Sequence, residues 1–250
     1  VHANWFEMNV NGARDIGSQI ASGLGKYQYI GINKASFRGA ITPCDFFSAG
    51  GSYGIGRGDG AYTANEWSAF TKIGPDAIQI ALEYGSGNSR YTFSGVDIEV
   101  RRTDASIAVD GEVNDVLSLD ISYDRNTMEF SNLNYQYTKQ SVRGGAFLEL
   151  GEYLILTGGL SAGMDSADYV VLGGDAGAMI VFSGIKLSVF YIIEQYIAPT
   201  TSSTETSKKG SGSGGSSGGS NGGNPYIQSS KIGESFASQR LSVGVSYAIP

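Results

Sequence analysis

Cysteine and histidine are almost missing from the sequence, and their scarcity excludes several kinds of chemistry. One cysteine, Cys44, among 250 residues allows no intrachain disulfide and no cysteine-rich zinc or iron–sulfur site. The one histidine, His2, lies near the N-terminus of the sequence, where order is usually poor. We therefore expect no nucleophilic catalysis with a histidine base and no multi-histidine metal site.

Charged residues are also scarce, and basic ones are scarcer than acidic ones. They make up 16% of the chain, against roughly 25% in typical soluble domains. The 17 Lys and Arg residues against 24 Asp and Glu residues give a net charge of −7. Because phosphate contacts need a basic footprint, we predict no nucleic-acid partner.

Long apolar runs are missing as well. The longest, around 178–182 and 189–193, are far shorter than the roughly 18 residues that a membrane-spanning helix needs. An apolar content of 41% is nevertheless too high for a disordered chain. The segment Val1 to Trp5 carries no initiator Met, basic region or apolar stretch, as expected of an exported chain whose signal peptide has been removed.

The dominant positive signal is alternation with a period of two residues, which predicts β-strands. It is clear over 77–84 and 116–124, and clearest at the end, where Leu241, Val243 and Val245 oppose small residues. Other segments carry it more weakly or with a change of phase: 26–38, 45–55, 91–100, 105–109, 128–137, 147–157, 169–182 and 186–197. The sequence thus predicts an all-β chain of about ten good strands and one or two weak ones.

Turn chemistry and composition suggest how the strands are organised. Turns are predicted at 85–88, 110–111, 124–126 and 183–184. Residues 1–25 remain unassigned, with an opening strand near Phe6 and a short helix or loop over 15–24 as the options. Residues 200–225, rich in Gly and Ser, are predicted to form a flexible, water-facing loop, although an engineered linker has the same composition. We predict one β domain over 1–250.

Alternation alone does not say which face of a sheet meets water. A soluble β-sandwich buries its apolar face, whereas a membrane barrel turns it to lipid. Small residues on the opposite face, low charge and abundant tyrosine favour lipid. Several of the 15 tyrosines fall near segment ends, where aromatic girdles of membrane barrels lie: Tyr84, Tyr123, Tyr137, Tyr153, Tyr169 and Tyr247.

Predicted loop lengths alternate between long and short, with the Gly/Ser segment long, 183–184 short and 161–168 longer. Together with the terminal strand Leu241–Ile249 and the strands over 77–197, this resembles the bacterial outer-membrane β-barrel proteins. The resemblance implies an antiparallel up-and-down transmembrane barrel of about 10–12 strands in the outer membrane, with lipid as a partner. It also implies periplasmic termini and an extracellular Gly/Ser loop. The family's final residue is commonly aromatic, whereas this sequence ends at Pro250.

A barrel of this kind would expose its polar faces to a lumen. The residues predicted to line it are Gln79, Glu83, Asp97, Glu99, Arg101, Asp120 and Glu149. Acidic side chains outnumber basic ones in this set, and carboxylates in a pore favour cations. In the alternative, the carboxylates pair with arginines and fill a narrow, non-conducting interior.

Other motifs support no further chemistry. The acidic clusters 110–115 and 165–168 do not follow the EF-hand spacing, and solvated turns are their commoner explanation. The tripeptide Arg57-Gly58-Asp59 spells an adhesion motif that is common by chance, and no phosphate-binding loop is present. We predict no catalytic residue, cofactor or metal, and no enzyme activity.

Two functions remain at this point. The first is a passive outer-membrane channel for small ions or solutes, or an envelope structural protein. The second is a soluble or surface-exposed β-sandwich subunit that self-assembles or mediates adhesion. Homo-oligomerisation is left open.

Overall fold

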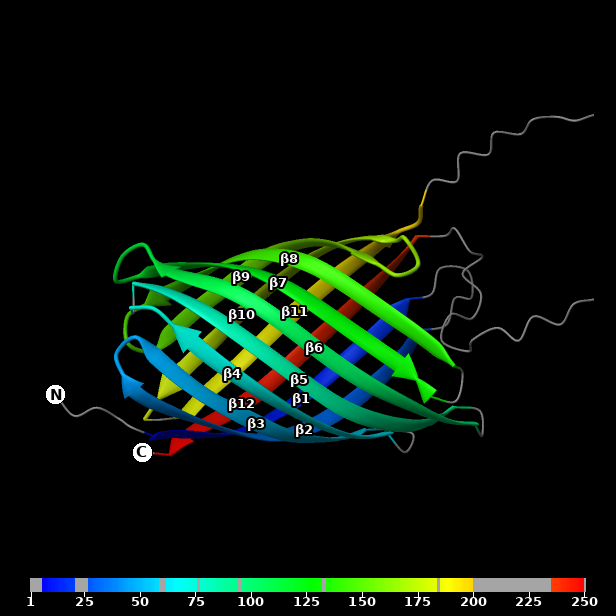
Figure 1. Ribbon diagram of the computed structural model, residues 1–250, viewed down its shortest axis with the longest axis horizontal. Coiled ribbons are helices and arrows are strands. Elements are labelled where there is room, and N and C mark those ends of the chain that lie inside the picture. The colour runs from blue at the N-terminus through cyan, green and yellow to red at the C-terminus, as the bar shows by residue number, and fades with distance from the viewer. Residues whose placement is uncertain are drawn as a thin grey trace, which may run out of the picture.

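The chain folds into a closed β-barrel of twelve strands (Figure 1). This computed structural model describes residues 6–20, 27–58, 62–75, 77–93, 96–131, 134–183, 185–199 and 235–249. Within these ranges no helix is long and apolar enough to cross a membrane. The Gly/Ser segment predicted as a loop lies outside the described residues.

The strands are long, between 12 and 18 residues. In chain order they are β1 Phe6–Ile20, β2 Tyr27–Cys44, β3 Phe47–Gly58, β4 Tyr62–Ile73, β5 Ile78–Phe93, β6 Val96–Glu112, β7 Leu117–Phe130, β8 Tyr135–Leu150, β9 Leu154–Asp165, β10 Val170–Phe182, β11 Ile185–Ile197 and β12 Phe236–Ile249. Each pairs antiparallel with its sequence neighbours, and β1 closes the barrel on β12. The predicted up-and-down barrel is confirmed.

An even number of strands brings both termini to one rim, which we call the terminal rim (Figure 1). The chain segments between strands at this rim are short: 45–46, 74–77, 113–116, 151–153 and 183–184. At the far rim, 198–235 joins β11 to β12, while 59–61, 94–95, 131–134 and 166–169 are short too. The predicted longer loop over 161–168 is wrong, because β9 continues to Asp165.

Register and strand number determine the width of the barrel. Following paired residues once around it shifts the register by about 14 residues, which corresponds to strands tilted by roughly 40°. Eight strands already leave an interior that side chains can just fill. Twelve strands therefore enclose additional space.

The apolar face of the sheet points outward. Leu119, Val243 and Val245 are 47%, 46% and 47% exposed, and their neighbours along the strands turn inward. Among the described residues, the buried apolar side chains are few: Ile98, Val100, Phe130 and Val171. A soluble β-sandwich would bury apolar side chains such as Leu119, Val243 and Val245 between its two sheets. Because they are exposed here, the alternative fold is wrong.

A girdle of aromatic side chains crosses the outer surface, and on β11 the exposed Ile193 and Ile197 lie beyond it toward the far rim. Register and tilt bring five outward side chains to a similar level: Tyr53, Trp67, Tyr84, Tyr123 and Tyr191. The rings of Trp67 and Tyr84 lie 5.9 Å apart between centroids. Aromatic girdles lie at lipid headgroup level, so the strands extend past this level toward the far rim. Tyr137 faces the interior, contrary to the prediction of a girdle position.

Beyond the girdle, the polarity of β6 and β7 is inverted. Ile98, Val100 and Phe130 face the interior and are 1%, 7% and 9% exposed, forming a small apolar cluster. Asp97 and Glu99 alternate with them and face outward, where they contact Arg90. This arrangement, apolar inside and charged outside, is that of a soluble protein, and it applies where the strands have left the lipid.

The inverted region explains why two predicted strands are wrong. The segments 91–100 and 128–137 each contain the turn of a hairpin, and no register shift occurs along β5–β6 or β7–β8. In 128–137, for example, Met128 and Phe130 on β7 and Tyr135 and Tyr137 on β8 all belong to the inward cluster, and the phase of the alternation changes at the turn between the two strands. The predicted strand 147–157 also spans a turn, at 151–153, where Gly151 adopts a φ of +71° that favours glycine.

Two strands were not predicted, and three predicted turns lie within strands. β1 lies in the unassigned N-terminal region, and β4 carried no recognised pattern. Residues 85–88, 110–111 and 124–126 lie within β5, β6 and β7, and the connection after β6 is at 113–116. In β5 and β7 the inward residues Gly85, Gly87, Asp124 and Asn126 line the interior cavity, which requires small and polar residues without requiring a turn.

The outward apolar face yields a direct test. Val245 is placed near the middle of the apolar band, and the substitution Val245→Arg is expected to lower the free energy of unfolding by about 2–4 kcal/mol, because arginine would enter hydrocarbon. The measurement is urea unfolding in phospholipid vesicles. Ser246→Arg, one position along on the lumen face, is the control and is expected to cost less; equal losses would contradict the assignment of faces.

Candidate functional site

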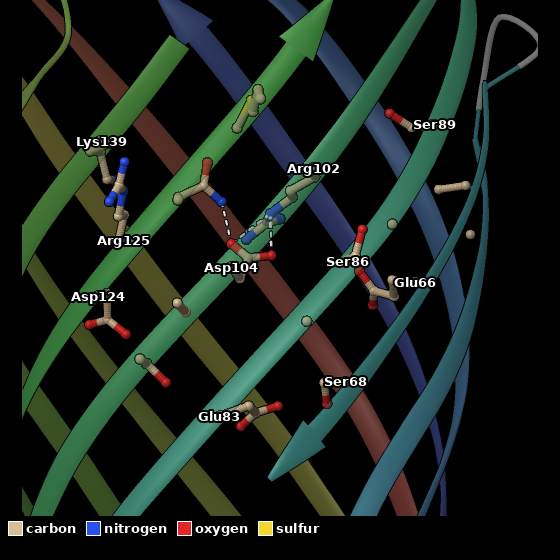
Figure 2. Close-up of a pocket in the computed structure, with 18 of the residues that line it drawn as sticks. Glu66, Ser68, Glu83, Ser86, Ser89, Arg102, Asp104, Asp124, Arg125 and Lys139 are labelled. Atoms are coloured by element: carbon tan, nitrogen blue, oxygen red, sulfur yellow. Dashed lines mark hydrogen bonds and ion pairs between the residues drawn. The ribbon is translucent and has the colours of Figure 1, made fainter. Parts of the chain in front are cut away.

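The barrel encloses a cavity of about 860 Å³, lined by side chains and backbone from β2 to β12 (Figure 2). Its volume falls in the range of small-molecule sites, roughly 300–1,000 Å³. Polar residues dominate the view: Glu66, Ser68, Glu83, Ser86, Ser89, Arg102, Asp104 and Asp124. Two of the residues labelled in Figure 2, Ser86 and Arg125, are placed on the outer face by register, together with Tyr84 and Tyr123. The cavity is the candidate functional site.

Four of the residues predicted to line the lumen are on its face by register. Glu83 lines the cavity directly. Asp120 lies next to the cavity, in contact with Arg143. Gln79 and Glu149 are nearer the terminal rim.

The other three are placed on the outer face, contrary to the prediction. Asp97, Glu99 and Arg101 alternate with the inward-facing Ile98 and Val100. The prediction took every apolar residue of β6 to face lipid. That rule fails here because the polarity of the strand inverts beyond the girdle.

The strongest ionic feature of the lumen is a bridge made by Arg143 on β8. Its Nε and Nη2 donate to the two carboxylate oxygens of Asp175 on β10, at 2.8 and 2.9 Å. Its Nη1 donates to Oδ2 of Asp120 on β7, at 2.6 Å. Because planar guanidinium matches a carboxylate in two-point geometry, the side chain is held firmly across four strands.

Two glycines allow this side chain to lie flat on the wall. A Cβ at Gly159 would lie 2.6 Å from Nη2 of Arg143, and one at Gly145 would collide with both Arg143 and Asp120. Any larger residue would push the guanidinium away from the wall and into the cavity. The glycines therefore keep the lumen open beside its most highly connected cation.

Three further ion pairs neutralise charges in the lumen. Lys139 on β8 reaches Glu194 on β11 at 2.5 Å, Lys34 reaches Asp15 at 2.8 Å, and Arg102 reaches Asp104 at 2.8 Å. Such pairs were the alternative prediction for the interior. They occur, but they lie along the wall of a cavity that remains open.

Some charges that line the cavity itself have no ion-pair partner among the described residues. These are the carboxylates Glu66, Glu83 and Asp124 and, on β12, the cation Arg240. Asp124 accepts a hydrogen bond from the Ser122 hydroxyl at 3.0 Å. Glu66 was not predicted because its strand, β4, was not predicted. A barrel with both termini at one rim needs an even number of strands, and this requirement could have indicated the missing strand.

The cavity is bounded toward the terminal rim by bulky side chains. On their own strands, Arg38, Phe70 and Asp120 lie between the cavity lining and that rim. The Arg38 guanidinium stands 3.9 Å from the centroid of the Phe70 ring, a cation–π contact. The side chains of Arg38 and Phe70, together with the Arg143 bridge, narrow the lumen here.

One acidic turn has a structural role. The carboxylate of Asp165 accepts hydrogen bonds from the backbone N–H groups of Ala167 and Tyr169, at 2.9 and 3.0 Å. Asp165 therefore caps the turn between β9 and β10. This gives a structural role to Asp165, one of the two acidic residues in the 165–168 cluster.

No protein-family model and no curated protein matches the sequence. Several solved structures nevertheless resemble the barrel. The KdgM porin is 10% identical, with a TM-score of 0.52 over 95% of this chain and 99% of the porin. The CymD monoaromatic hydrocarbon channel is 8% identical, with a TM-score of 0.54 over 97% and 88%. The translocator domain of autotransporter NalP from Neisseria meningitidis is 13% identical, with a TM-score of 0.50 over 98% and 88%.

The fold is that of a bacterial outer-membrane β-barrel. This agrees with the outward apolar face, the aromatic girdle and the common rim of the two termini. At identities this low the likeness concerns the fold, and the properties of the lumen must come from this chain's own residues.

The Arg143 bridge gives a second test. Arg143→Met is expected to lower the free energy of unfolding by about 2–3 kcal/mol, because it leaves Asp120 and Asp175 without their shared cation in a partly buried site. Urea unfolding in vesicles measures the loss. Adding Asp120→Asn and Asp175→Asn is expected to restore part of it, and no recovery would indicate that packing, not charge, holds the site.

Proposed function

We propose that this protein is a passive channel of the bacterial outer membrane, with a lumen that prefers small cations. The observation that supports it is the open cavity inside a twelve-stranded barrel whose outer surface is apolar. No catalytic constellation is needed for this role, because diffusion through a hydrated lumen requires only width and a suitable lining.

The preference for cations follows from the charges that remain after pairing. Each of the four paired cations of the lumen neutralises a carboxylate on the wall. They are Lys34, Arg102, Lys139 and Arg143. Three carboxylates and one guanidinium then remain in the cavity, so the local potential is negative. A lumen of this sign concentrates cations and repels anions.

The outer surface and the fold support this location in the outer membrane. The apolar band and girdle fit a bilayer, and the resembling structures include porins and an autotransporter translocator.

If the protein is a membrane barrel, it will require detergent for extraction and will show heat-modifiable migration on a gel. Recovery in the aqueous fraction without detergent would contradict the proposal.

Selectivity is the sharper test. The triple variant Glu66→Gln, Glu83→Gln and Asp124→Asn is expected to move the cation-to-anion permeability ratio from above one toward one or below, because the three unpaired carboxylates are lost. Reversal potentials in a planar bilayer under a salt gradient measure this ratio.

The control removes the same kind of charge from the outer face. Asp97→Asn with Glu99→Gln is expected to leave the permeability ratio unchanged, since both carboxylates face away from the lumen. A wild-type protein that forms no conducting pores would refute the channel, and equal effects of both variants would refute the assigned lining.

A further inference from the structure

We propose that the outer wall of the barrel binds the phosphorylated headgroup of an outer-leaflet lipid, in a groove between β3 and β6 just beyond the aromatic girdle. The groove has a volume of about 510 Å³, and its charged lining residues differ from those of the lumen cavity, although both are lined by Asn65 and Asn88 of the wall between them. The proposal depends on the membrane location proposed above and on the expected orientation, with the terminal rim toward the periplasm, but not on conduction through the lumen.

Short side chains form the floor of the groove and long ones form its sides. Thr63 and Asn65 on β4 and Asn88 on β5 lie in the middle, and the backbone N–H of Asn88 donates to Oδ1 of Asn65 at 3.3 Å. Arg57 on β3 and Arg101 on β6 stand on either side, on the outer face by register. The result is a polar floor between two guanidinium groups.

The groove is basic. Its charged lining residues are Arg57, Arg90, Arg101 and Glu99, which leaves an excess of positive charge. Arg90 is already engaged, at 2.5 Å from Asp97 and 3.9 Å from Glu99.

Among the described residues, neither Arg57 nor Arg101 has an ion-pair partner within 4.0 Å. The cross-strand neighbour of Arg101 on β7, Glu129, is not part of the groove lining. Guanidinium groups bind phosphate in two-point geometry, so these two arginines are suited to an anionic phosphate group.

The lower edge of the groove identifies the ligand as a lipid. Tyr53 and Ile55, which are 54% and 49% exposed, lead from the arginines down to the apolar band. An amphiphile with phosphate above and acyl chains below fits both halves at once. Free inorganic phosphate would contact only the basic half, and a zwitterionic lipid would present no excess of negative charge.

Native mass spectrometry of the whole purified barrel in detergent tests the site, with lipid A and phosphatidylcholine as the two probes. Lipid A is a doubly phosphorylated, acylated disaccharide. The wild-type protein is expected to retain lipid A at least about tenfold more tightly than phosphatidylcholine. The double variant Arg57→Gln with Arg101→Gln is expected to lose at least about tenfold in lipid A affinity.

A matched control is the adjacent residue on the other face. Arg102→Gln removes a cation of the lumen from the same strand and is expected to leave lipid A affinity at the wild-type value. Heat-modifiable migration verifies that each variant is folded. If the double variant does not fold, the single variants Arg57→Gln and Arg101→Gln are each expected to show a partial loss.

Three results would overturn the proposal: equal retention of the two lipids, an unchanged affinity in folded arginine variants, or displacement of lipid A by an equal concentration of inorganic phosphate. Single-channel conductance of the double variant is expected to equal that of the wild type. Loss of lipid A binding with conductance intact therefore supports the groove alone, whereas wild-type protein that binds lipid A but does not conduct sinks only the channel.

Discussion

Backbone hydrogen bonding is the constraint on which the rest of this structure depends. Hydrocarbon offers no partner to an N–H or C=O group, so a sheet that crosses it must have no edge. The pairing of β1 with β12, continuous from Met8↔Ile249 to Ile20↔Ala237, closes the sheet. Once closure satisfies the backbone, the side chains need only match lipid on one face and water on the other.

That division explains which strands could be predicted from the sequence. β5, β7 and β12 alternate cleanly where lipid and lumen lie on opposite faces, and the barrel followed from them. On β6 and β7 beyond the girdle the outer face carries charged residues, and the inward apolar cluster of Ile98 and Phe130 reverses the pattern. Through such a reversal the two-residue period continues, but the apolar residues no longer mark the outer face. Asp97, Glu99 and Arg101 were therefore assigned to the wrong face.

The lumen was less predictable than the wall. Glu83 and Asp120 could be assigned to the inner face from alternation alone, but pairing depends on register and tilt. Arg143 binds carboxylates 23 and 32 positions away in sequence, across strands on both sides of its own. Which carboxylates remain unpaired, and hence the sign of the lumen, follows only once these distant contacts are known.

The inverted polarity at the far ends of β5 to β8 divides the barrel into a part that meets water and a part that meets lipid. The hairpin ends of β5–β6 and β7–β8 have their own apolar cluster and their own external ion pairs. They amount to a water-adapted collar mounted on a lipid-adapted cylinder. Sequence changes in the collar can therefore accumulate under the rules of aqueous proteins, while the cylinder beneath it stays bound by those of the bilayer.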